Sequence, residues 1–95
     1  MAIYVDDMQR QASVGGRAAR WSHLIADTSE ELFTFARTLG LSRSWVQKPG
    51  TFREHFDVTE GMRAKAIAYG AIPISYFDLP QVTRRIRDQR RAESA

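Results

Sequence analysis

Short apolar runs alternate with helical patterns along the chain. Four of these runs have the length and composition of β-strands: residues 2–5, 21–27, 54–58 and 71–75. The first run ends at Asp6 and Asp7, which places two carboxylates at its carboxyl end. The last contains Pro73, which has no backbone N–H to donate and therefore belongs at a sheet edge or at a bulge. The pattern predicts three to four short strands.

The clearest helical pattern follows the second run. Thr28 and Glu31 have the spacing of a capping box, in which the two side chains satisfy backbone N–H groups at the start of a helix. Apolar residues then recur at helical spacing up to Gly40, a residue type typical of the position after a helix. A helix over residues 29–39 is therefore expected.

Two more helices are expected in the C-terminal half of the chain. The first of them has two candidate N-caps, Asp57, which has capping-box spacing to Glu60, and Thr59, and it closes at Gly70. The other starts beside Asp78 and carries its apolar residues on one face. It then continues as an arginine-rich C-terminal end.

The order of these elements predicts the fold class. Residues 8–19 show no periodicity and are expected to form a long loop, in which Gly15 and Gly16 supply flexibility. The elements follow the order β-β-α-β-α-β-α, and strands that alternate with helices over short loops favour parallel pairing through right-handed crossovers. We therefore predict an α/β fold with a small, mainly parallel sheet of three to four strands and three helices, the last of them arginine-rich.

Composition limits the number of domains and the chemistry. A chain of 95 residues has room for one core, so we expect residues 1–83 to form a single compact α/β domain and residues 84–95 to be its basic helix end or tail. The absence of cysteine excludes disulfide frameworks, thiolate metal sites and thiol nucleophiles. No apolar run is long enough to cross a bilayer, and the N-terminus lacks a secretory pattern, so a cytoplasmic protein without membrane contact is expected.

The formal charge of +3 is confined to the C-terminal end of the chain. Residues 1–83 carry nine basic and nine acidic side chains, which cancel. Residues 84–95 carry two acids and five arginines: Arg84, Arg85, Arg87, Arg90 and Arg91. Such a run can neutralise nucleic-acid phosphates, which makes a non-enzymatic nucleic-acid- or protein-binding module one functional class. A solvated helix end, favoured by cations near its negative pole, explains the run equally well.

Polar residues at the strand ends are the candidates for a functional site. In open α/β sheets, ligands bind beyond the carboxyl ends of the strands. Each histidine shortly precedes an aspartate on a predicted strand, and these are the candidate catalytic groups: His23 with Asp27, and His55 with Asp57. Parallel strands would bring them to one rim, together with Asp6 from the first strand. Paired imidazoles and carboxylates suit general acid–base chemistry.

Two alternatives remain for these groups. Two histidines and a carboxylate can also bind a divalent metal ion, although the spacing of His23 and His55 matches no compact metal-binding motif. Separate structural roles are the other alternative, because an aspartate directly before a helix often serves as a cap. The cofactor is therefore left undetermined, with a divalent metal as one option.

Arginines indicate the kind of ligand. Arg43, Arg53 and Arg63 lie in loops or in a first helical turn that the parallel arrangement places at the same rim. Guanidinium groups there favour phosphate or carboxylate. We therefore expect Asp6 and these arginines to bind a small anionic ligand, phosphorylated or nucleotide-like, which the histidines orient or hydrolyse. The sequence leaves open whether the protein is an enzyme.

Aromatic residues and the edge strand bear on further contacts. Trp21 and Trp45 are expected to pack in the core, with a stacking platform for a base as the alternative. An edge strand and exposed aromatic residues would also suit a homodimer.

Two motifs resemble a known family. Trp-x-His-Leu-x-x-Asp over residues 21–27 and His-Phe-Asp-Val over residues 55–58 are similar to those of a bacterial and phage family catalogued as domain of unknown function 4031. The resemblance runs from about residue 3 to residue 86, and the chain looks like the stand-alone form typical of phage genomes. It implies no activity. The family pattern, as the resemblance implies, is built from six positions of this chain: Asp6, His23, Asp27, His55, Asp57 and Arg63.

Overall fold

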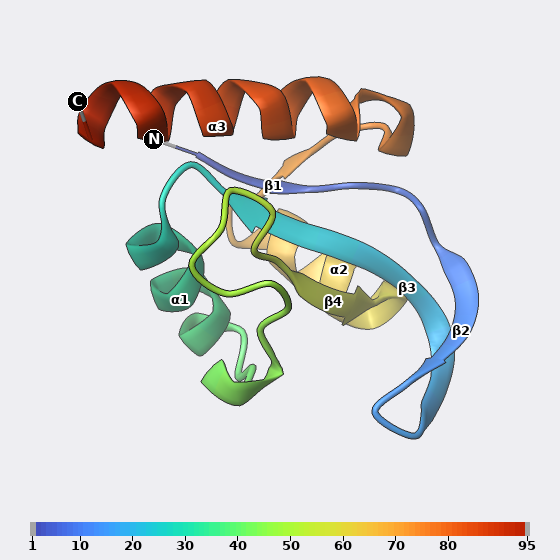
Figure 1. Ribbon diagram of the computed structural model, residues 1–95. Coiled ribbons are helices and arrows are strands. Elements are labelled where there is room, and N and C mark those ends of the chain that lie inside the picture. The colour runs from blue at the N-terminus through green and yellow to red at the C-terminus, as the bar shows by residue number, and fades with distance from the viewer. Residues whose placement is uncertain (1, 95) are drawn as a thin grey trace.

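The computed structural model describes residues 2–94 and contains a mixed sheet with helices on both faces (Figure 1). The strands are β1 (Ile3–Val5), β2 (Arg10–Val14), β3 (Arg17–Ala26), β4 (Phe56–Thr59) and β5 (Ile72–Pro73). The helices are α1 (Ser29–Thr38), α2 (Glu60–Ala68) and α3 (Leu79–Ser94), with short 3-10 helices η1 (Arg43–Trp45) and η2 (Tyr76–Asp78). The α/β class and the three helices are confirmed, but the sheet has five strands rather than three to four. The predicted segments of residues 1–83 and 84–95 include Met1 and Ala95, which lie outside the described residues.

The central strand β3 runs against all of its neighbours. It pairs antiparallel with β1 and β2 along one edge and with β4 along the other, while β5 adds to β1 in parallel. The prediction of a mainly parallel sheet is therefore wrong. The antiparallel direction of β4 follows from the connection between α1 and β4, residues 39–55. This connection is much longer than the short loop of a parallel crossover. It returns the chain to the end of the sheet where β3 stops, so that Phe56 enters β4 opposite Leu24.

A β-hairpin occupies most of the stretch that was expected to be a loop. β2 pairs with β3 along its whole length. Gly15 and Gly16 connect the two strands with φ angles of 57° and 81°, the left-handed conformation that a two-residue hairpin turn requires. The interpretation of this segment as a long loop is wrong, and the two glycines form a turn.

Side-chain caps fix the starts of α1 and α2. The Thr28 hydroxyl accepts a hydrogen bond from the backbone N–H of Glu31 at 3.2 Å and donates to Glu31 Oε1 at 2.8 Å, which confirms the predicted cap. At α2 the cap is Thr59, whose hydroxyl accepts from the backbone N–H of Met62 at 3.2 Å. Because Asp57 is not the cap, its carboxylate is available to other groups.

The two faces of the sheet pack against different helices. Leu24 belongs to the larger core cluster, which joins the sheet to α1 and α2. On the opposite face, Tyr4 and Ile25 pack against Ile86 of α3, and Figure 1 shows α3 and α1 on opposite sides of the sheet. Successive residues of a strand point to opposite faces. His23, two residues before Ile25, therefore lies on the α3 side.

The structure also bears on the edge strand, on the two tryptophans and on membrane-spanning helices. β5, with Pro73, is an edge strand, as expected. Trp21 is buried, also as expected, whereas Trp45 on η1 is 60% exposed and does not belong to the core. Within residues 2–94, none of the helices has the length and hydrophobicity that a membrane span requires.

Candidate functional site

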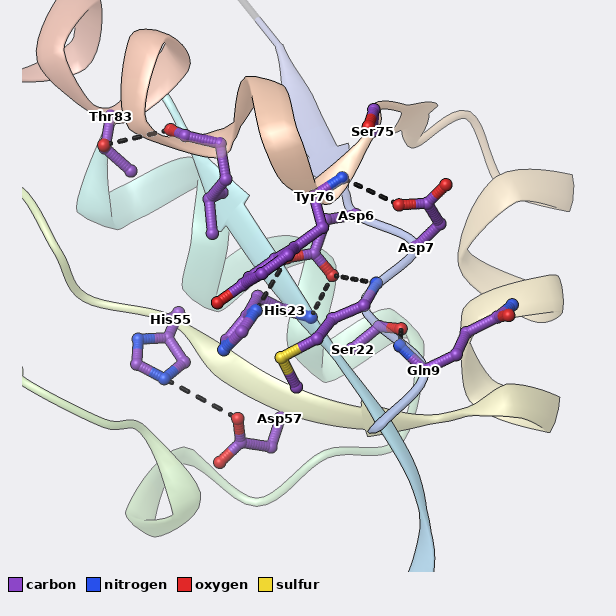
Figure 2. A network of polar contacts seen from close by, with 12 residues as sticks. Asp6, Asp7, Gln9, Ser22, His23, His55, Asp57, Ser75, Tyr76 and Thr83 are labelled. Atoms are coloured by element: carbon purple, nitrogen blue, oxygen red, sulfur yellow. Dashed lines mark hydrogen bonds and ion pairs between the residues drawn. The ribbon is translucent and has the colours of Figure 1, made fainter. Parts of the chain in front are cut away.

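Three residues form a row across the sheet on its α3 side. The antiparallel register places His23 of β3 opposite Asp57 of β4. Asp6, which directly follows β1, lies on the other side of His23, and its backbone N–H donates to the His23 carbonyl at 3.1 Å. His55 precedes Asp57 by two residues and therefore shares its face. Figure 2 shows these side chains gathered from three segments of the chain.

Asp6 is fully buried and holds His23 in place (Figure 2). Its Oδ1 accepts hydrogen bonds from the backbone N–H of His23 at 2.9 Å and of Met8 at 3.3 Å. Its Oδ2 lies 2.7 Å from His23 Nδ1. An ionised carboxylate only accepts, so Nδ1 carries the proton of the neutral ring and Nε2 keeps its lone pair.

His55 is oriented in the same way by a backbone group. Its Nδ1 lies 2.8 Å from the carbonyl oxygen of Arg53, and because a carbonyl only accepts, Nε2 again keeps the lone pair. This Nε2 lies 3.6 Å from Asp57 Oδ1. The ring centroids of His23 and His55 are 5.1 Å apart, in an edge-to-face arrangement.

One ligand atom each from His23, His55 and Asp57 lie within 4.8 Å of one another. The three side chains are 20%, 17% and 20% exposed, so that they are accessible from solvent. Two imidazole nitrogens and a carboxylate oxygen are a donor set that binds divalent transition metals. Metal-binding histidines usually donate their other N–H to a carboxylate or a carbonyl, as both histidines do here. This arrangement can hold a metal ion.

Tyr76 covers His23 from the segment before α3. The two rings are stacked, with centroids 6.0 Å apart and planes 16° from parallel. The backbone N–H of Tyr76 donates to Asp7 Oδ1 at 2.7 Å, which ties η2 to the carboxyl end of β1 (Figure 2). No sequence pattern marks Tyr76, because only the fold brings this short irregular segment next to His23.

A cleft of about 290 Å³ opens beside the two histidines. His23 and His55 line it together with residues at the start of α3, among them Thr83. Two cationic side chains also line it, Lys48 and Arg53. Arg53 is one of the predicted ligand-binding residues, whereas Lys48, in the long connection between α1 and β4, was not among them. Positive charge at this position suits an anionic ligand.

The pKa of His23 is raised above the usual value of histidine. The hydrogen bond with Asp6 is the largest cause. Burial acts against it, because desolvation disfavours the charged ring, while the charges of Asp6 and Asp57 raise the pKa further. The carboxylates on either side of His23 thus favour a positive charge between them.

Three other predicted site residues belong neither to the group of possible metal ligands nor to the lining of the cleft. Asp27 directly follows β3 and lies beside the amino end of β1, where its carboxylate accepts from the backbone N–H of Ala2 at 2.8 Å, away from Asp6 at the carboxyl end of β1. Arg63 donates from Nε to the backbone carbonyl of Asp6 at 2.7 Å, so it supports the end of β1. Arg43 lies 4.0 Å from the centre of an aromatic ring of α1, away from the cleft.

Comparison with protein families places this geometry in context. The model of a family described as protein of unknown function (DUF4031) matches residues 3–88. The chain belongs to the DUF4031 family. This confirms the resemblance seen in the sequence motifs, and the matched region includes Asp6, His23, His55 and Asp57. No curated protein and no solved structure matches the chain.

The DUF4031 match ends inside α3, before the last two predicted nucleic-acid contacts, Arg90 and Arg91. Three of the five arginines make contacts within the molecule. Arg85 donates to the hydroxyl of a β1 tyrosine at 2.5 Å, Arg87 pairs with its neighbour Asp88 at 3.1 Å, and Arg90 pairs with a buried glutamate at 3.1 Å. These contacts explain much of the arginine run without a nucleic acid.

Proposed function

We propose that this DUF4031 domain binds a divalent transition-metal ion through His23, His55 and Asp57, and binds a small phosphorylated ligand at that ion. The observation that carries the proposal is the convergence of three ligand atoms within 4.8 Å while both Nδ1 atoms are bound to other groups. Each ring has one lone pair left, and both lone pairs are available to the same ion.

The donor set favours particular ions and an open coordination position. Imidazole nitrogen suits zinc, iron, copper and nickel, and carboxylate oxygen suits manganese. Three protein ligands leave at least one position for water or a ligand, as in catalytic rather than structural zinc sites. The partial exposure of the three side chains allows a ligand to reach that position from solvent.

The charges around the cleft support an anionic ligand. Lys48 and Arg53 line the cleft beside the histidines. The two charges of a divalent ion would balance the carboxylates of Asp6 and Asp57. The side chains of Lys48 and Arg53 would then leave an excess of positive charge at the cleft. A phosphoryl group that reaches both the ion and these cations fits this charge distribution.

Hydrolysis of a phosphoester is the reaction that such a centre suits. An ion held by His23, His55 and Asp57 would lower the pKa of a bound water and would so supply a nucleophile near neutral pH. In the overall reaction, the oxygen of a water molecule would become bonded to phosphorus, the bond from phosphorus to the alcohol oxygen would break, and a proton of the water would pass to the leaving alcohol. In this reaction the histidines are metal ligands, and Asp6 is a positioning residue for His23.

Calorimetric titration of the protein, without a histidine tag, with Zn²⁺ and separately with Mn²⁺ tests the proposal. We expect one ion per chain. Asp57→Asn should lower the metal affinity by at least about tenfold. Even the loss of a residue that only hydrogen-bonds to a metal ligand lowers the affinity by about this much. Hydrolysis of p-nitrophenyl phosphate, measured with the same ions, should be abolished by a chelator.

Asp88→Asn is the matched control, because Asp88 lies exposed on α3 and the substitution is the same. It should leave the metal affinity unchanged. No heat of binding with millimolar concentrations of either ion would contradict the metal site. An equal effect of Asp57→Asn and Asp88→Asn would do so as well.

A further inference from the structure

A second cleft, of about 570 Å³, lies beside Asp57. His23 and His55 line the first cleft, whereas Asp57 lines the second. The three ligand atoms lie within 4.8 Å of one another, so the donor group stands where the two clefts come together. A ligand held at the ion can therefore extend into either cleft.

The register of β3 and β4 places the second cleft close to the donor group. The pair that follows His23 and Asp57 on the same face is Trp21 opposite Thr59, and both residues line the second cleft. Two residues of a strand span about 7 Å. The second cleft thus extends from Asp57 to Trp21 and Thr59, which lie about 7 Å along the strands from the row that would hold the ion.

Two indole rings give this cleft an aromatic lining. Trp45 is 60% exposed, an unusual state for so large an apolar side chain. Trp21 is buried, and its Nε1 donates to the carbonyl of Ala12 at 2.9 Å, so its ring is fixed. Leu41 and Met62 add apolar surface. A cleft of this volume with an aromatic lining is typical of small-molecule sites.

Polar groups complete the lining at a few positions. Ser44, Gln47 and Arg17 also line the cleft, and their side chains carry a hydroxyl, an amide and a guanidinium group. The hydroxyl and the amide can both donate and accept, and the guanidinium donates. A planar heterocycle with polar atoms at its edge can use the indole of Trp45 for its face and these groups for its edge.

We infer that the phosphorylated ligand is a nucleotide, with its phosphate at the proposed ion and its base in the second cleft against Trp45. This inference rests on the proposed function, whose metal and phosphate groups it extends. The phosphate lies near the ion and the cations of the first cleft, the ribose crosses the donor row, and the base stacks on the indole. A phosphorylated ligand without a base would leave the aromatic cleft empty.

Titration with AMP, GMP, CMP and UMP in the presence of Mn²⁺ tests the inference, with ribose 5-phosphate as the matched ligand that lacks a base. At least one nucleotide should bind about 5- to 150-fold more tightly than ribose 5-phosphate, the range expected for stacking of one base on an aromatic side chain. Trp45→Ala should remove most of this difference and leave the affinity for ribose 5-phosphate unchanged. Trp45→Phe, which keeps an aromatic face, should retain part of it.

The outcomes separate the base site from the metal site. Equal, metal-dependent affinities for the nucleotides and ribose 5-phosphate would overturn the base site and leave the metal site intact. An equal loss of affinity for AMP and for ribose 5-phosphate in Trp45→Ala would overturn it too. Nucleotide binding that requires Trp45 but no ion would support the base site while contradicting the proposed metal centre. No nucleotide binding with or without the ion would overturn the inference.

Discussion

Asp6 links the backbone of the sheet to the chemistry of the candidate site. Its carboxylate has no exposed surface and accepts from two backbone N–H groups as well as from the ring of His23. Burying a carboxylate is costly unless donors of this kind compensate the lost hydration. The same carboxylate fixes the proton of His23 on Nδ1, so the orientation of this ring depends on a residue that a ligand does not touch.

Asp6→Asn is therefore expected to affect both stability and metal affinity. The amide group of asparagine would direct N–H donors at groups that already donate, and it removes the charge that attracts the imidazole. We expect a loss of about 2 kcal/mol in the free energy of unfolding and a decrease of about tenfold in metal affinity. Urea unfolding and calorimetric titration measure the two effects. Unchanged values for both would show that Asp6 does not position His23.

The raised pKa of His23 predicts a pH dependence of stability in the metal-free protein. The folded state binds this proton more tightly than the unfolded state, mainly through the hydrogen bond with Asp6. The resulting stabilisation is complete below the ordinary pKa of histidine, about 6.5, and is lost as the pH rises through the higher pKa of the folded state. Urea unfolding from about pH 5.5 to pH 8.5 measures this decline. His23→Gln should flatten the profile, and a variant that declines like the wild type would contradict the assignment.

Among the elements, the direction of β3 decides which predicted site residues meet. β1 and β5 run the same way, so Asp6 and Tyr76 come together just beyond their carboxyl ends, as expected for an open sheet. The prediction that β4 contributes its carboxyl end is wrong, because Asp57 lies near the amino end of β4 and His55 precedes the strand. β3 runs the other way and contributes His23 from its middle, while Asp27, which directly follows it, lies beside the amino end of β1. The sequence could predict which residues lie on strands, but spacing carries no information about strand direction.

The β2–β3 hairpin was missed for a different physical reason. All but the last residue of β2 is exposed, so the strand shows no alternation of apolar and polar residues. Its register comes from the hairpin turn, and Gly15-Gly16 was the one local signal for that turn. By contrast, the caps and apolar periodicity of α1 are local features, and its start was predicted correctly. Elements defined by their own side chains could be predicted, and those defined by a partner strand could not.

Glu54 fixes the connection between α1 and β4, which carries three residues that line the first cleft, Lys48, Arg53 and His55. It is buried, and its carboxylate accepts from the hydroxyl of Ser29 and from the backbone N–H of Gly50 at 3.1 Å. It also pairs with Arg90 of α3 at 3.1 Å. His55 directly follows, so its place beside His23 depends on contacts with α1 and α3. Contacts over such sequence separations leave no local pattern, which is why the position of Lys48 could not be inferred from this segment.

In the molecule as a whole, α3 carries the net charge and also packs against the core. All of the +3 lies in residues 84–95. Yet Ile86 is 1% exposed and packs with Tyr4 and Ile25, and Arg90 donates to two backbone carbonyls at 3.0 Å in addition to its ion pair. A nucleic-acid role of the helix therefore has to be tested by substituting exposed arginines such as Arg84, because a deletion would also remove core contacts.

Truncation after Thr83 is accordingly expected to unfold the protein. It removes Ile86, whose burial contributes about 2 kcal/mol, and Arg90, whose loss leaves Glu54 buried without its cation at a cost of about 3 kcal/mol or more. The sum approaches the whole stability of a small domain, about 5–15 kcal/mol. Circular dichroism and thermal unfolding measure the effect. Truncation after Arg91 keeps both contacts and is the matched control, with an expected change below about 0.5 kcal/mol. A truncated chain of residues 1–83 that unfolded at the temperature of the full chain would show instead that residues 84–95 are a dispensable tail.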